Sequence, residues 1–249
     1  MRKLLYTALL ALTIIGCTKP QMDDNGSNIN TVTDISSTTT TTTHEAETIT
    51  LIDTFDDGKG NITRTYQVAD FGDTKIIAAL VDGEQQHWFF GGQDTFQVNG
   101  DSTFELITYE YETVNYRGNE ILVESGFEPD YTQLDDALDL SRNNWVTDKI
   151  YVFGDLGNFG YAGLAREGEF IVSFTGFETH VMLHENGHNY DFANPTYAQL
   201  LDPLYHLVYD TGYYLGPIAE YRAEMFARYY LFVTELPQML YEQLELILG

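Results

Sequence analysis

The chain has 249 residues, of which 43% are hydrophobic and 14% aromatic, and this composition excludes a protein that is disordered throughout. Its 12 basic and 38 acidic residues give a formal net charge of -26, which excludes the basic surface that nucleic-acid binding requires. The length allows one large domain or two small ones.

Residues 1–17 have the pattern of an export signal. Two basic residues precede an apolar run from Leu4 to Ile15, which is too short for a transmembrane helix. The run leads into Gly16 and Cys17, and this ending resembles the lipobox of bacterial lipoproteins, in which the cysteine receives lipid after cleavage. Cys17 is also the only cysteine. We therefore expect a protein of the bacterial cell envelope, anchored in a membrane by lipid on Cys17 and facing the periplasm or the cell exterior. An ordinary signal peptide that contains a cysteine is the alternative.

Residues 18–47 are predicted to form a disordered tether, because they are polar, lack a hydrophobic period and include the threonine tract 38–43. A β-rich region is predicted over residues 48–128. Its candidate strands are 48–52, 75–81 and 104–109, separated by the turn signals Asp57-Gly58, Asp82-Gly83 and Asn99-Gly100. No group of residues with evident chemistry lies in this region.

Residues 129–249 are predicted to form an α+β domain. The expected elements are a helix over 130–145, a strand over 150–153, a hairpin of strands 161–165 and 169–174, a helix carrying residues 184–188, and helices over 196–210, 217–234 and 237–248. Thr175 and Glu178 have the spacing of a capping box, so Thr175 is expected to cap the helix that follows the hairpin.

The segment HENGH, His184 to His188, is the candidate metal site. Two histidines four residues apart on a helix project from one face and can share one ion. Glu185 stands beside them, placed to take a proton from a metal-activated water rather than to bind the metal. The alternative is an amphipathic helix with two surface histidines. Gly187 is a poor residue for the middle of a helix, and it predicts that another backbone passes close by.

A catalytic zinc takes three protein ligands and leaves one position for water. The third histidine of the metzincins is absent, because the matching positions hold Asp191 and Asn194. The third ligand is therefore expected from a separate helix, the one that begins near Pro217. It carries Glu220 and Glu224 one turn apart on the same face.

HENGHNYD (His184 to Asp191) followed by EMFA (Glu224 to Ala227) resembles the gluzincin clade of the anthrax lethal factor catalytic domain and the Pro-Pro endopeptidases. The segment 236–244 also resembles the closing helix of that clade. The resemblance covers about residues 130–249 and implies a zincin-like domain with one Zn²⁺ per chain. It implies that His184, His188 and Glu224 are the ligands and Glu185 the general base. Phe226 and Ala227 favour Glu224 over Glu220.

Other family positions match less closely. The family has an oxyanion-stabilising tyrosine shortly before the third ligand, but the closest spacing holds Pro217, so Tyr214 or Tyr213 is expected in that role. Lethal factor has an acidic residue four positions after its ligand, where this chain has Arg228. Asp191 is the expected substitute, a carboxylate that supports a ligand histidine.

The sequence thus predicts a lipid-anchored zinc metalloendopeptidase acting on peptide or protein substrates, with no nucleic-acid partner. The hairpin of residues 161–174 would offer an edge strand to extended substrate. The alternatives are a non-catalytic surface-binding lipoprotein on a zincin scaffold, or a zinc hydrolase of a non-peptide bond. Glu185 favours an enzyme, since a scaffold has no need of a base. His180, one turn before His184, is expected on the surface.

Overall fold

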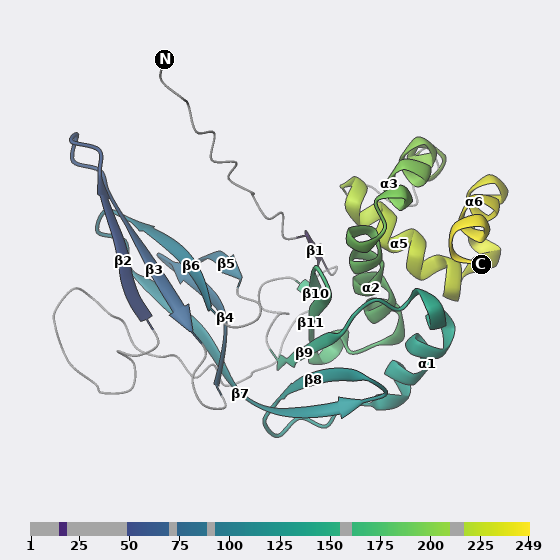
Figure 1. Cartoon of the computed structure of the whole chain (residues 1–249), viewed down its shortest axis with the longest axis horizontal. Helices are drawn as coiled ribbons and strands as arrows, with labels where there is room; N and C mark the ends of the chain where they lie inside the picture. The colour runs from purple at the N-terminus through teal and green to yellow at the C-terminus, as the bar shows by residue number, and fades with distance from the viewer. Residues whose placement is uncertain (1–14, 19–48, 70–73, 89–92, 155–160, 210–216) are drawn as a thin grey trace, which may run out of the picture.

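The protein was analysed as a computed structural model that describes residues 15–18, 49–69, 74–88, 93–154, 161–209 and 217–249 (Figure 1). The fold is α+β, with an eight-stranded open sheet, a three-stranded antiparallel sheet and a group of helices toward the C-terminus. Within the described part of the chain, no helix is both long and apolar enough to cross a lipid bilayer.

The large sheet contains, in spatial order, β1 (Ile15–Thr18), β10 (Tyr161–Arg166), β11 (Glu169–Ser173), β9 (Lys149–Phe153), β8 (Asn119–Glu124), β7 (Phe104–Tyr116), β4 (Thr74–Val81) and β5 (Glu84–Trp88). The small sheet contains β2 (Ile49–Asp56), β3 (Ile62–Ala69) and β6 (Gln93–Asn99). The helices are α1 (Tyr131–Ser141), α2 (Thr179–Ala193), α3 (Pro195–Leu201), α4 (Tyr205–Tyr209), α5 (Ile218–Leu231) and α6 (Gln238–Leu248).

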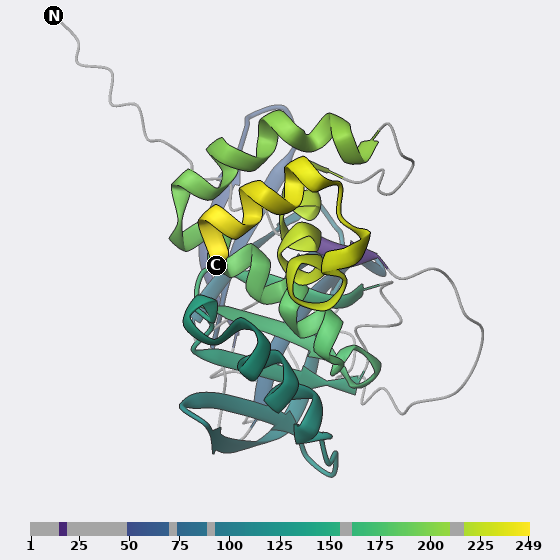
Figure 2. The same ribbon diagram turned by 90° about the vertical axis from the view of Figure 1, so that its right-hand side faces the viewer.

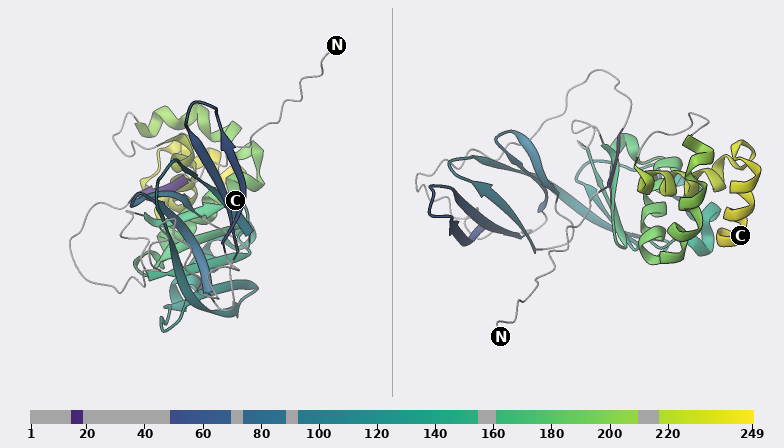
Figure 3. Two further views of the ribbon diagram at one scale, coloured as in Figure 1. Left: turned by 90° about the vertical axis from the view of Figure 1, so that its left-hand side faces the viewer. Right: turned by 90° about the horizontal axis from the view of Figure 1, so that it is seen from above.

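The long strand β7 joins the two ends of the molecule. Its first part pairs with β4, and its second part, from Tyr111 to Tyr116, pairs with β8. Figure 3 shows the small sheet at one end of the molecule and the helices at the other. The large sheet therefore contains strands from both sides of residue 128, which the sequence predicts as a boundary between regions.

The small sheet packs on the β4 and β7 part of the large one through a separate apolar cluster. Its buried members are Val68, Phe96 and Val98 from the small sheet and Ile76, Ala79 and Leu106 from the large sheet. Phe96 and Val98 of β6 alternate as the period of two requires, whereas Ile76 and Ala79 of β4 are three residues apart because the pairing of β4 with β7 is irregular between Ile76 and Ala78.

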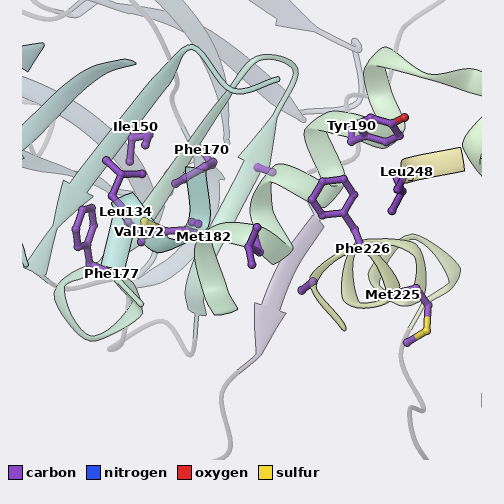
Figure 4. Packing of buried hydrophobic residues seen from close by; sticks show 14 of the residues in the cluster. Leu134, Ile150, Phe170, Val172, Phe177, Met182, Tyr190, Met225, Phe226 and Leu248 are labelled. Carbon is purple, nitrogen blue, oxygen red and sulfur yellow. The ribbon is translucent and has the colours of Figure 1, made fainter. Parts of the chain in front are cut away.

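The helices cover the face formed by β8 to β11, onto which Figure 2 looks. Side chains of β9 alternate between two buried faces: Ile150 and Val152 pack on the helices, and Tyr151 packs on the other side. Strand β9 is parallel to both β8 and β11, and burial on both faces explains its unbroken apolar sequence. Figure 4 shows residues of this core, including Phe170 of β11 and Met182 of α2.

The hairpin predicted before the motif helix is confirmed as β10 and β11, which turn at Gly168 with a φ of 80°. The predicted capping box is wrong. Helix α2 begins at Thr179, after Glu178, which makes no capping hydrogen bond with its side chain. Thr175 instead lies in the 3-10 turn Phe174–Gly176, whose cap is Ser173.

The helix predicted over 196–210 is divided. Helix α3 ends at Leu201, a 3-10 turn follows over Asp202–Leu204, and α4 begins at Tyr205. Pro203 lies in this turn, where its missing N–H and its ring interrupt regular helical hydrogen bonding. The first helix, α1, has the expected start, because the Asp130 side chain accepts a hydrogen bond from the Thr132 N–H.

Candidate metal centre

Helices α2 and α5 approach each other closely at Gly187. A Cβ on residue 187 would lie 2.9 Å from the carbonyl oxygen of Ala223 and 2.9 Å from the Cβ of Phe226. The prediction that a second backbone passes close to Gly187 is therefore confirmed. This contact brings the histidines of α2 within reach of the glutamates of α5.

Three buried side chains converge between these helices: His184, His188 and Glu220. His184 Nε2 lies 3.2 Å from Glu220 Oε2, and His188 Nε2 lies 3.4 Å from Glu220 Oε1. The side chains are 3%, 1% and 5% exposed, respectively. The two histidines project from one face of α2, as their spacing of four predicts.

The residues fit a zinc ion by two physical criteria. Two atoms that each lie about 2.0–2.1 Å from one tetrahedral zinc are about 3.3–3.4 Å apart, and the two nitrogen–oxygen separations above match that distance. In addition, His188 Nε2 and Glu220 Oε1 are buried without a hydrogen-bond partner. Buried polar atoms without a partner are costly unless something else binds them. Imidazole nitrogen and carboxylate oxygen are ordinary zinc ligands.

Glu224, the third ligand expected from the sequence, has a different position. Its Oε2 lies 3.2 Å from His184 Nδ1, on the other nitrogen of that ring, and 3.2 Å from His180 Nε2. The geometry therefore favours Glu220 as the third ligand and corrects the choice of Glu224. Glu224 instead contacts the outer nitrogen of His184, a position from which a carboxylate orients a metal-binding imidazole.

A ligand at Glu220 changes the comparison with the pattern named in the sequence analysis, because the E-x-F-A match through Phe226 and Ala227 is lost while two other positions fit better. Four residues after Glu220 stands Glu224, an acidic residue, so Arg228 no longer occupies the place of a missing acid. The family's tyrosine spacing moves by the same four residues, from Pro217 to Tyr213. Tyr213 and Tyr214 both lie outside the described residues, so the oxyanion tyrosine stays a prediction.

Asp191, expected to support a ligand histidine, instead forms a salt bridge with Arg222. Its Oδ2 accepts a hydrogen bond of 2.8 Å from Arg222 Nε, and Arg222 also binds Asp202. Asp191 thus ties α2 to α5 and, through Arg222, to the turn after α3. His180 is half exposed, as expected, yet it also reaches the site through Glu224.

No protein-family model matches this chain. No curated protein is significantly similar to it either.

Glu185 is fully buried, and neither carboxylate oxygen has a hydrogen-bond partner. Burial raises the pKa of Glu185 to about 8 in the metal-free protein. A divalent cation nearby would favour the charged carboxylate and lower this pKa again. The charged carboxylate is the form of Glu185 that can accept a proton as a general base.

In the metal-free site, two of the three candidate ligands, Glu220 and His188, are already in the protonation states that bind a metal. Burial raises the pKa of Glu220, but the interactions of its carboxylate with the His184 and His188 rings outweigh this effect and lower the pKa to about 2. Burial lowers the pKa of His188 from its usual value, so its imidazole is neutral at pH 7. Carboxylate and neutral imidazole are the forms that metals bind.

Two asparagines on α2, Asn186 and Asn189, form hydrogen bonds with residues 146–147 just before β9. The sequence analysis did not single them out. Asn186 Oδ1 accepts hydrogen bonds from the Val146 N–H and from Thr147 Oγ1, both at 3.0 Å. Asn189 Nδ2 donates to Thr147 Oγ1 at 2.9 Å. Asparagine is a poor helix former, so two of them beside the metal ligands were the available signal.

Proposed function

We propose that the protein is a zinc-dependent endopeptidase of the zincin type, exported and anchored by lipid on Cys17. The observation that supports the proposal best is the convergence of His184, His188 and Glu220 at separations that suit one tetrahedral ion. Glu185 adds a buried and unpaired carboxylate beside them. A scaffold that only binds a partner would not need such a carboxylate.

His184, His188 and Glu220 would hold the ion. Bound zinc supplies a Lewis acid that polarises a carbonyl and lowers the pKa of water. Glu185 accepts the proton of the attacking water and passes it to the leaving amine, which is general base and then general acid catalysis. Tyr213 or Tyr214 is the proposed donor to the oxyanion.

The substrate would add to the outer edge of β10. This edge suits an extended chain, because β1 pairs there antiparallel, with Gly16 opposite Leu164 and Ile15 opposite Ala165. Cleavage before Cys17 would remove both Ile15 and Gly16 from β1 and leave the edge to other strands. The neighbouring Gly163 lies against Glu185, so a peptide paired here would pass beside the general base.

The test uses the chain without residues 1–16 and with Cys17→Ser, purified with zinc and compared with its Glu185→Gln variant. Zinc content is measured by atomic absorption, and cleavage is measured on a peptide library by mass spectrometry. We expect one zinc per chain in both proteins and cleavage by the parent alone. If the parent binds zinc but cleaves no peptide, a non-catalytic binding scaffold is the better description. If it hydrolyses only ester substrates, it is a zinc hydrolase of a non-peptide bond.

A further inference from the structure

Arg228, on the last turn of α5, has a defined place next to the metal centre. Its Nε donates a hydrogen bond of 2.7 Å to Glu224 Oε1, and its Nη1 lies 3.3 Å from Glu235 Oε2. Its guanidinium carbon is 5.8 Å from the ring centroid of Phe232. The side chain is only 19% exposed. Such a guanidinium has a fixed direction, unlike a mobile surface arginine.

The two carboxylate oxygens of Glu224 contact different residues. Oε1 accepts from Arg228, whereas Oε2 faces both His180 Nε2 and His184 Nδ1. A carboxylate is planar, so a partner that fixes Oε1 also fixes the direction of Oε2. Because Glu224 holds Nδ1 of the His184 ring, it determines where Nε2 of that ring points, and Nε2 faces Glu220.

We infer that Arg228 is a positioning residue of the metal centre, which acts through Glu224 to hold the His184 ring in its metal-binding orientation. Arg228 does not itself face the ion. The inference rests on the proposed zinc site, but it does not depend on which bond the enzyme cleaves. Groups that orient a metal-binding histidine typically contribute about 10–100-fold in metal affinity.

A merely structural role is the competing explanation, since Arg228 also ties α5 to the 3-10 turn Val233–Glu235 through Glu235. The two roles differ in what a substitution should change. Loss of the tie to Glu235 would lower the melting temperature of the metal-free protein. Loss of the contact with Glu224 would weaken zinc binding even where the fold is retained.

The experiment measures the zinc dissociation constant by chelator competition in the lipid-free exported chain. Its variants are Arg228→Met, Arg228→Lys, Glu224→Gln, the double variant Arg228→Met/Glu224→Gln, and Glu235→Gln as the control. We expect Arg228→Met to bind zinc about 10–100-fold more weakly. Arg228→Lys should recover part of the loss, because lysine can still donate one hydrogen bond to Glu224. Glu235→Gln should bind zinc as the parent does.

The double variant distinguishes an action through Glu224 from an independent one. If Arg228 acts through Glu224, the double variant should bind zinc no more weakly than Glu224→Gln alone. The visible spectrum of the cobalt-substituted protein should change in Arg228→Met and Glu224→Gln alike, because both change the geometry of the ligands.

Three results would overturn the inference: parental zinc affinity in Arg228→Met, additive losses in the double variant, or an equal loss in Glu235→Gln. If the parent protein binds no zinc, both this inference and the proposed function are wrong. A parent that binds zinc but cleaves no peptide would contradict the proposed function alone, because the affinities still decide the role of Arg228.

Discussion

The carboxylate of Glu185 lies directly against the backbone of Gly163. A Cβ on residue 163 would come within 2.5 Å of Glu185 Oε1 and 2.7 Å of its Cγ. Strand β10 and helix α2 are therefore fitted together at the residue proposed as general base. Any side chain larger than hydrogen at residue 163 would therefore displace Glu185.

Gly163→Ala should consequently displace Glu185. We expect kcat/KM for peptide cleavage to fall by at least about tenfold, because small displacements of a catalytic group are costly. Zinc content should stay at the parental level, since the three atoms nearest to a Cβ on residue 163 all belong to Glu185, which is not a proposed ligand. Full activity in a folded Gly163→Ala variant would contradict the placement of Glu185.

Glu185→Gln tests the base itself. Glutamine keeps the size of the side chain but cannot accept the proton, so turnover should fall by a factor of about a hundred or more. Zinc binding should persist, because Glu185 is not among the three proposed ligands. Paired measurements of zinc content and peptide cleavage check both parts, and an active variant would remove Glu185 from the mechanism.

The two glutamates of α5 should respond differently to the same substitution. Glu220→Gln should lose zinc to a moderate chelator, since two histidines alone rarely retain the ion. Glu224→Gln should keep zinc with an affinity lower by about 10–100-fold. Titration against a chromogenic chelator ranks the two variants, and the reverse order would restore Glu224 as the third ligand.

Glu185 should lower the stability of the metal-free protein progressively as pH rises from 4.5 to about 8. Over this range the folded protein keeps a proton on Glu185 that the unfolded chain has released, because burial raises the pKa of Glu185 to about 8. The folded state then binds more protons, so the free energy of unfolding decreases with pH. In Glu185→Gln this contribution should be absent, whereas the opposite contribution of His188, whose pKa burial lowers, remains in both proteins, so the difference between the two proteins isolates Glu185. Urea denaturation of both proteins at pH 5 and pH 8, with a chelator present, gives the comparison.

Cys17→Ser should yield a protein that no longer fractionates with membranes. The serine hydroxyl cannot take the place of the thiol that receives lipid, so the chain should remain soluble or unprocessed. Cell fractionation followed by immunoblotting is the measurement. Membrane association that equals the parent's would leave an ordinary signal peptide as the better description.

Residue spacing was enough to predict that His184 and His188 share one side of a helix, because the turn of a helix fixes which side chains share a face. The hairpin and the close contact at Gly187 were also predictable from local signals. The choice between Glu220 and Glu224 was not. Both lie on the same face of α5, and the position of that helix along α2 is set by packing at Gly187 and Ala223.

The start of α2 shows a second limit of local patterns. Thr175 and Glu178 have the spacing of a capping box, but Ser173 closes a 3-10 turn first. The N-terminus of α2 is instead fixed by α1, because the N–H and the hydroxyl of Thr179 both donate hydrogen bonds to Gln133 Oε1. A partner 46 residues away in sequence cannot be recognised from a window of a few residues.

The place of β9 in the sheet has a practical consequence for dissecting the molecule. Both of its edges are occupied, one by β11 and the other by β8, which precedes the boundary expected at residue 129. A fragment starting at residue 129 would therefore expose the backbone of an apolar parallel strand to solvent. Open edges of this kind recruit strands from other molecules. Such a fragment should aggregate on expression, whereas the whole chain keeps both edges of β9 paired.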